Sequence, residues 1–222
     1  MTRTSELEWR LRESGLKPES IALASEANAR LMERYSSENE LWTISAAVRA
    51  AFVADNYDGD LGATNILDIG CGAECSEDGF KPWLARALSS IGANVIGIDI
   101  ARSHGENYTH VVADLTREQI SDVVENRKYG VVLCNAFLDS PKLGDSIGDS
   151  INARIWLIRQ FPGLLQQPSG VLITDAGRHN FMRCRGEQLF GDAGFTKTSK
   201  DYPDCQLMFY SAFRVLNSGA EK

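Results

Sequence analysis

The sequence predicts an α/β domain with a mostly parallel sheet, preceded by a helical cap. Two observations support this fold class. From residue 65 to about 216, short apolar runs alternate with amphipathic segments of helix length, and strands joined by such spacers form βαβ units. Before them, residues 1–60 show helical periodicity and no strand pattern. We therefore expect one domain over residues 1–222, with the cap at 1–60 and the core at 65–216.

The cap and the strands are predicted in order along the chain. Apolar residues at helical spacing predict two cap helices, at about 21–35 and 41–52. Six apolar runs then predict strands: NILDI (65–69), NVIGID (94–99), HVVAD (110–114), YGVVLCN (129–135), GVLITD (170–175) and QLMFYSAFRV (206–215).

The spacers predict the remaining helices. The first has one apolar face, a proline in its first turn and Gly92 just past its end; the face consists of Phe80, Trp83, Leu84, Ala87 and Leu88. Segments 117–127, 147–166 and 181–192 are expected to be helical as well. The link 100–110 is too short for a normal crossover helix.

The composition limits the classes of function. With 43% hydrophobic and 24% charged residues, the chain is typical of a soluble globular protein. A net charge of −7 without a long basic run argues against a nucleic-acid partner, leaving Arg178, Arg183 and Arg185 as a candidate basic patch. No stretch approaches the roughly 20 apolar residues of a membrane span, and the N-terminus has no signal-peptide core, so no membrane partner and a cytoplasmic location are expected.

The cysteines predict reduced thiols. Their number is odd, and they form no Cys-x-x-Cys pair: Cys71, Cys75, Cys134, Cys184 and Cys205. With no further ligand at metal-binding spacing, no zinc site is expected.

Polar residues follow the predicted strands, where ligands of open α/β sheets bind. The first strand contains Asp68 and leads into Gly70 and Gly72. The later strand ends contribute Asp99, Asp114, Asn135 and Asp175. An acid at any one of these positions is also the ordinary polar residue of a loop. Together with the paired glycines, the acids indicate a ligand site at this edge of the sheet.

The glycine turn does not suit a phosphate ligand. Gly70 and Gly72 allow a sharp turn and a close approach to a ligand. A dinucleotide-binding motif requires a third glycine where Cys75 stands, and the acids from Glu74 onward would repel a pyrophosphate. The chain also contains neither a Gly-x-x-x-x-Gly-Lys-Ser/Thr loop nor a Tyr-x-x-x-Lys pair.

The sequence resembles the class I S-adenosylmethionine-dependent methyltransferases over 65–216, most specifically in ILDIGCG, VIGIDIA and VVADL. The resemblance implies a Rossmann-like, seven-stranded sheet with helices on both faces and an antiparallel last strand. It also implies the site of the cofactor, S-adenosyl-L-methionine. The methionine end would lie at Asp68, Gly70, Cys71 and Gly72, and the ribose at Asp99. The adenine would lie at Ile100, Asp114 and Leu115, and the transferable methyl beside Asn135 and Ala136.

Two departures from the family pattern concern the same region. Glu74 stands where a third glycine is frequent, which makes the loop bulkier and more acidic. The shortened link after Asp99 removes part of a helix that normally flanks the adenine.

The catalytic residues are less defined, because a methyl transfer depends mainly on alignment and needs a base only for a protonated acceptor. His179 and His104 are the candidate bases, although a lone loop histidine is more often a solvated surface residue. The segments AFLDSPK and LITDAG loosely resemble the magnesium-binding strand ends of catechol O-methyltransferases, at Asp139 and Asp175. That pattern requires Asn where Ala176 stands, so no metal is expected.

The expected activity is O- or N-methylation of a small-molecule acceptor. The segment after Asn135 does not have the Asn/Asp-Pro-Pro-Tyr motif of enzymes that methylate planar amide or amino nitrogens. Tyr35, Trp42 and the loop 137–150 are candidate walls of the acceptor pocket, although aromatic residues at helical spacing are more often core. Non-methyl chemistry with the same cofactor and a regulatory protein without turnover stay as alternatives, and a homodimer is left open.

Overall fold

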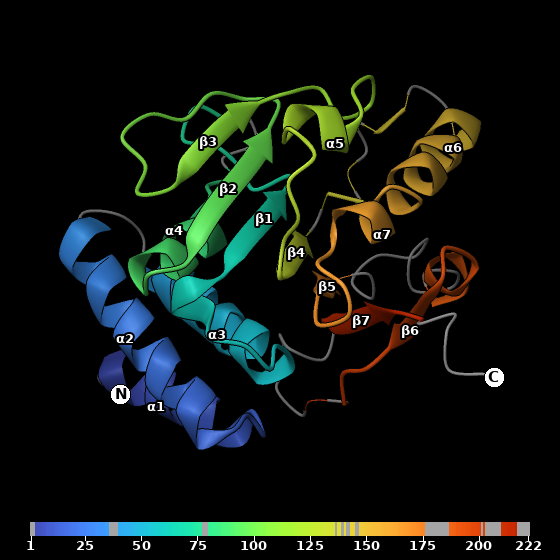
Figure 1. The fold of residues 1–222 in the computed structure, drawn as a ribbon. Coiled ribbons are helices and arrows are strands. Elements are labelled where there is room, and N and C mark those ends of the chain that lie inside the picture. The colour runs from blue at the N-terminus through green and yellow to red at the C-terminus, as the bar shows by residue number, and fades with distance from the viewer. Residues whose placement is uncertain are drawn as a thin grey trace.

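A computed structural model gives the fold of the chain (Figure 1). It describes residues 3–35, 40–76, 80–135, 137–138, 140, 143–144, 147–175, 187–200, 202 and 210–216.

The centre of the molecule is one seven-stranded sheet with the order β3-β2-β1-β4-β5-β7-β6. The first five strands are parallel, and β7 is antiparallel to both of its neighbours. The strands are β1 (Asn65–Ile69), β2 (Asn94–Asp99), β3 (Thr109–Val112), β4 (Val131–Cys134), β5 (Val171–Thr174), β6 (Phe195–Lys197) and β7 (Ser211–Val215). The predicted mostly parallel sheet and its antiparallel last strand are confirmed.

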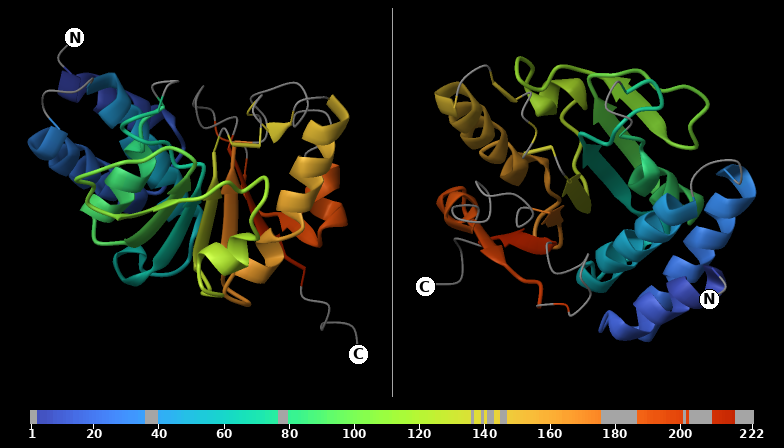
Figure 2. Two further views of the ribbon diagram at one scale, coloured as in Figure 1. Left: turned by 90° about the horizontal axis from the view of Figure 1, so that it is seen from above. Right: turned by 180° about the vertical axis from the view of Figure 1, so that it is seen from behind.

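Helices cover both faces of the sheet (Figure 2). Alternate residues of the central strands supply two separate cores: Ile66 belongs to the core under the N-terminal helices, and Leu67 to the core on the opposite face. The first face carries α1 (Arg3–Glu13), α2 (Pro18–Tyr35), α3 (Glu40–Asn56) and α4 (Trp83–Ser90). The second carries α5 (Ile120–Val123), α6 (Ile147–Ile158) and α7 (Phe161–Leu164).

The N-terminal cap is a layer of the fold. Val48, Ala51 and Phe52 of α3 are fully buried in the same core as β1 and α4. The sequence predicts α2 and α3 but not α1, whose described buried apolar positions, Leu7 and Leu11, make too short a pattern. A 3-10 turn, η1 (Leu61–Ala63), leads from this layer into β1.

Several predicted helices are shorter than expected. The helix predicted at 117–127 is the single turn α5, because the chain leaves the helical region at Glu125 and Asn126, with φ of 55° and 57°. The helix predicted at 147–166 splits into α6 and α7. Pro162 would clash with the carbonyl of Ile158, four residues earlier, and α6 ends at Ile158.

The remaining helix predictions have mixed outcomes. Helix α4 ends before Gly92, as predicted. It begins later than expected, because Pro82 is its N-cap rather than part of its first turn, and Phe80 precedes it rather than lying on its face. Of the segment 181–192, residues 187–192 are helical and the rest lies outside the described residues. The link predicted at 100–110 has no crossover helix, as expected; residues 100–108 contain no helical turn, and β3 begins at Thr109. None of the helices in the described ranges combines the length and hydropathy of a membrane span.

Candidate functional site

The glycine turn connects β1 to the segment before α4. The backbone N–H groups of Gly70 and Cys71 both donate to the carbonyl oxygen of Ile98, over 2.9 and 3.1 Å, and so bind the turn to β2. Gly70 and Gly72 have φ of 67° and 86°. A Cβ at Gly72 would lie 2.5 Å from the carbonyl oxygen of Phe80, so no side chain fits there. Both glycines thus form the sharp turn that the sequence predicts, and the approach of a ligand to them stays a prediction.

Asp99 ends β2 beside this turn. One carboxylate oxygen accepts the Gly72 N–H over 3.0 Å, and the other accepts the Ala101 N–H over 3.0 Å. Each oxygen retains a further lone pair, and the side chain is half-buried, so the carboxylate is held in a fixed orientation and still accessible. The next residue, Ile100, is 66% exposed and places an apolar surface beside the acid.

A cavity of about 130 Å³ opens at the ends of β1 and β4. Four of its lining residues belong to the predicted cofactor site, and the others come from α3, from the segment before α4 and from the first turn of α4. The lining consists of Trp42, Arg49, Asp68, Gly70, Cys71, Phe80, Lys81, Trp83, Leu84 and Asn135. The cavity therefore joins residues from the N-terminal layer and from the sheet.

Asp68 is the buried acid of this cavity. Asp68 is 2% exposed, and burial is the main reason that the pKa of its carboxyl is raised to about 7. The positive charge of Arg49 lowers this pKa, and the negative charge of Asp99 raises it. The protonation of Asp68 thus changes near neutral pH.

Asn135 follows β4 and lies in the same cavity. It is 5% exposed, and neither its side-chain nitrogen nor its oxygen has a hydrogen-bond partner among the residues that the structure describes. Buried polar atoms are nearly always hydrogen-bonded, so this amide is available to a polar group that enters the cavity.

Arg49 is a site residue that the sequence reasoning missed. It comes from α3, and its guanidinium donates to the carbonyl and hydroxyl oxygens of Ser45 over 3.2 and 3.1 Å while acting electrostatically on Asp68. A signal was present, because Arg49 is the single charge within SAAVRAAFVA, an otherwise apolar stretch of a buried helix.

Cys71 lines the cavity, and its thiol contacts other residues of the protein. The sulfur donates to the Gly72 carbonyl oxygen over 3.1 Å and lies 3.9 Å from the Tyr108 hydroxyl. Burial, followed by the nearby Asp68 and Asp99, raises the pKa of the thiol well above its ordinary value, so Cys71 stays uncharged.

Asp114 and Leu115 lie farther along the same sheet edge, after β3. One oxygen of Asp114 accepts from the backbone and hydroxyl of Thr116, over 3.1 and 2.6 Å, and so closes its own turn. Leu115 is buried in the core on the second face. Their predicted contacts with adenine stay predictions.

The other candidates have different outcomes. Trp42 lines the cavity with 47% of its surface exposed, whereas Tyr35 packs with its ring 5.8 Å from that of Trp83 and is not part of the cavity lining.

His104 is exposed on the link 100–108, and Asp175 is buried at the end of β5. His179, Ala136, Asp139 and the basic candidates Arg178, Arg183 and Arg185 lie outside the described residues. Within the described ranges, no group of three metal-ligating side chains comes together.

The comparison with known proteins finds similarity in fold and none in sequence families. No protein-family model and no curated protein matches the sequence. Among solved structures, the glycopeptide N-methyltransferase MtfA in complex with S-adenosylhomocysteine aligns over 77% of this chain and 89% of its own, with 10% identity and a TM-score of 0.52.

Two further alignments have lower TM-scores. A TehB-like S-adenosylmethionine-dependent methyltransferase from Corynebacterium glutamicum aligns over 77% of this chain and 95% of its own, with 19% identity and a TM-score of 0.49. The fibrillarin pre-rRNA processing protein of Methanococcus jannaschii aligns over 69% of this chain and 66% of its own, with 13% identity and a TM-score of 0.42.

The strand order and the likeness to the glycopeptide enzyme identify the fold as the Rossmann-like fold of class I S-adenosylmethionine-dependent methyltransferases. At 10% identity the likeness concerns the fold, and the reaction must be argued from the site.

Proposed function

We propose that the chain is an S-adenosyl-L-methionine-dependent methyltransferase acting on a small-molecule acceptor, with S-adenosyl-L-homocysteine as its product. The observation that carries the proposal is the cavity, which combines Asp68, Arg49 and the unpartnered amide of Asn135. The amino-acid end of the cofactor carries one ammonium and one carboxylate. A carboxylate, a guanidinium and an amide with free donors and an acceptor complement those groups.

The residues around the cavity fit the rest of the cofactor. Asp99 retains lone pairs for the two ribose hydroxyls, and the exposed side chain of Ile100 offers an apolar surface to the adenine. Gly72 packs closely against the backbone of Phe80, where a side chain would collide, while its N–H donates to Asp99. Among the described residues, Arg49 and Lys81 are the cations that line the cavity, and either could pair with the carboxylate of the amino-acid end.

The chain's own contribution to the reaction is alignment. The cofactor, when bound, supplies a methyl group that its sulfonium already activates. Asp68, Arg49 and Asn135 would hold the amino-acid end, and the aromatic rings of Trp42 and Phe80 would exclude water at the cavity. His104 and His179 remain our candidates for removing a proton from the acceptor, and the proposal requires no metal.

The proposed class of acceptor rests on the net charge of the chain and on the residues that line the cavity. A net charge of −7 disfavours a polyanionic acceptor, and the aromatic lining of the cavity favours a small partly apolar one. A cytoplasmic location belongs to the same proposal, because the described cysteines Cys71, Cys75 and Cys134 are free thiols.

Calorimetry with S-adenosylmethionine, S-adenosylhomocysteine, NAD and ATP tests the cofactor. We expect micromolar binding of the first two and no binding of NAD or ATP, because acids surround the glycine turn. NAD binding as tight as that of S-adenosylmethionine would refute the proposal. Accumulation of S-adenosylhomocysteine with cell metabolites separates turnover from binding alone.

Asp99→Ala tests the ribose assignment in the same experiment. Loss of hydrogen bonds to a charged group, about 1.5–3 kcal/mol, predicts roughly 10- to 150-fold weaker cofactor binding. Because Asp99 also accepts from Gly72 and Ala101, we expect the free variant to lose about 1–3 kcal/mol of stability as well, so its folding must be verified. Asp58→Ala, on an exposed carboxylate paired with Arg214, is the control that should leave affinity unchanged.

A further inference from the structure

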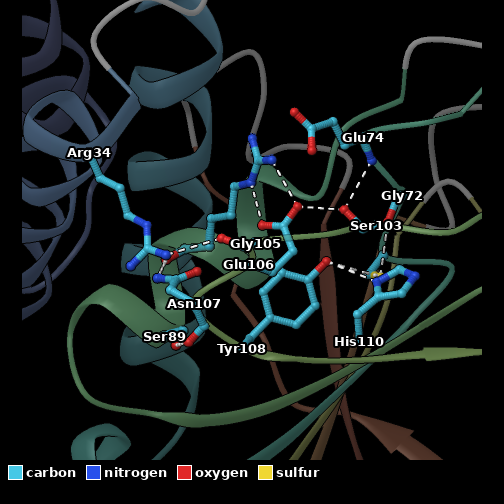
Figure 3. A network of polar contacts seen from close by, with 12 residues as sticks. Arg34, Gly72, Glu74, Ser89, Ser103, Gly105, Glu106, Asn107, Tyr108 and His110 are labelled. Carbon is cyan, nitrogen blue, oxygen red and sulfur yellow. Dashed lines mark hydrogen bonds and ion pairs between the residues drawn. The ribbon is translucent and has the colours of Figure 1, made fainter.

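The link between β2 and β3 is tied to the glycine turn through a chain of polar contacts (Figure 3). This link, residues 100–108, replaces a crossover helix and lies against α4. The Ser89 hydroxyl donates to the Asn107 carbonyl oxygen over 2.5 Å, and the Asn107 amide donates to the Arg86 carbonyl oxygen over 3.0 Å. Arg34 of α2 donates to the Gly105 carbonyl oxygen over 3.1 Å. The link is therefore fixed along its length without helical structure.

A buried ion pair anchors the middle of the link. Arg86 of α4 and Glu106 form two parallel hydrogen bonds of 2.8 Å each, and their side chains are 2% and 3% exposed. The Arg86 guanidinium also lies 4.3 Å from the ring centre of Tyr35. Two-point contact fixes both the position and the rotation of the Glu106 carboxylate.

Ser103 connects the Glu106 carboxylate to the glycine turn through two hydrogen bonds. Its hydroxyl donates to Glu106 over 2.5 Å, because an ionised carboxylate can only accept. The Ser103 oxygen is then free to accept the backbone N–H of Glu74 over 3.1 Å. Burial raises the pKa of Glu106, but hydrogen bonds from Arg86 and Ser103 outweigh it and leave the pKa below its usual range, so the acceptor stays ionised. Figure 3 shows Ser103 between Glu106 and Glu74.

We infer that Ser103 is a positioning residue for the methionine end of the cofactor site. Asp99 holds the turn at Gly72, and Ser103 holds it two residues further on, at Glu74. Glu74 does not have a positive φ, so its backbone is not strained, and the contact with Ser103 fixes the position of its N–H in the turn. A turn ordered before binding loses less entropy when the ligand arrives. The inference rests on the proposed function, because it assigns a role within that site.

The test compares two ligands on Ser103→Ala. S-adenosylhomocysteine carries the amino-acid end, and 5′-methylthioadenosine lacks it while keeping the ribose and adenine. We expect S-adenosylhomocysteine to bind roughly 3- to 10-fold more weakly to the variant, because the turn loses its contact at Glu74 and must be ordered on binding. Binding of 5′-methylthioadenosine should change by less than about 2-fold. Ser103→Thr keeps the hydroxyl and should restore binding to within about 2-fold. Ser25→Ala removes an exposed hydroxyl that donates to the Ile21 carbonyl oxygen on α2, and it should affect neither ligand.

The outcomes separate this inference from the proposed function. If the parent chain binds S-adenosylhomocysteine and Ser103→Ala binds it equally well, the positioning role is wrong and the proposed cofactor stands. Equal weakening of both ligands would also overturn the role, because the effect would then not be confined to the amino-acid end. If the parent binds neither ligand, the proposed function fails, and the inference fails with it.

Discussion

At the scale of single residues, the raised pKa of Asp68 predicts that ligand binding in the cavity depends on pH. Burial is the main cause of its pKa of about 7, and the positive charge of Arg49 offsets only part of that effect. A ligand ammonium placed beside the carboxylate would favour the ionised form. Binding at a pH below 7 would therefore require Asp68 to release a proton.

This linkage predicts that S-adenosylhomocysteine binds more tightly as the pH rises from 6 to 7.5. The affinity should increase by up to about tenfold per pH unit below pH 7 and level off above it, because Asp68 is then already ionised. Calorimetry across this range measures the slope. Asp68→Asn should remove it, and a parent protein whose affinity is independent of pH would exclude Asp68 as the partner of the ammonium.

The same residue affects the stability of the free protein with a defined sign. The folded pKa of about 7 lies above the ordinary value of 3.8, so the folded state binds more protons between these two pH values. The free energy of unfolding from this group therefore falls as the pH rises through that window. A buried carboxyl that lowers stability near neutral pH is typical of a functional site rather than of a structural one.

At the scale of elements, the buried pair Arg86–Glu106 stabilises a connection that has no helix of its own. The pair bridges α4 and the link 100–108, and its side chains are almost completely buried. Removing one partner leaves the other charge without compensation in a region of low dielectric constant. The exposed pair Arg30–Glu26 on α2 provides a contrast, because its side chains are 53% and 51% exposed.

Glu106→Gln should therefore lower the free energy of unfolding by about 3–5 kcal/mol, whereas Glu26→Gln should change it by less than about 1 kcal/mol. Urea unfolding followed by circular dichroism measures both variants. Similar small effects for the two substitutions would mean that the link is held by its backbone contacts with Ser89 and Arg34 rather than by the ion pair.

The elements also show how far the sequence determines the fold. Strands β1, β2, β4 and β5 could be predicted because all of them are runs of largely buried apolar residues. Strand β6 could not, because only Phe195 of its three residues is buried. The ends of α5 and α6 depend on two residues with positive φ and on one proline, so periodicity alone overestimated the lengths of both helices.

The site was predictable to the extent that its residues are local to the strand ends. The glycine turn, Asp68, Asp99 and Asn135 follow directly from the strand pattern. Arg49 and Ser103 do not, because one reaches the site through the packing of α3 on the sheet and the other through contacts between two loops. Their roles become visible only when the tertiary structure brings these segments together.

At the scale of the whole molecule, the N-terminal layer and the sheet form one unit. Helices α1 to α4 share a continuous core with the sheet. The C-terminal part of the chain adds polar contacts to that layer: the Tyr202 hydroxyl donates to Asp55 over 2.7 Å, and Arg214 donates to Asp58 over 2.7 Å. The layer also contributes Arg49 and Trp42 to the cavity, whose lining therefore comes from both parts.

We therefore expect the chain to unfold in one cooperative transition that S-adenosylhomocysteine shifts as a whole. A ligand present at 100 times its dissociation constant stabilises the folded state by about 2.7 kcal/mol. For a chain of this size, each kcal/mol raises the midpoint of thermal unfolding by about 2–4 °C, so the expected shift is roughly 5–10 °C. Differential scanning calorimetry with and without the ligand measures the shift, and NAD at the same concentration serves as the control that should have no effect. Agreement of the calorimetric and van't Hoff enthalpies would establish the single transition. Two transitions, of which the ligand moves only one, would instead show that the N-terminal helices fold separately from the sheet and do not contribute to the ligand site.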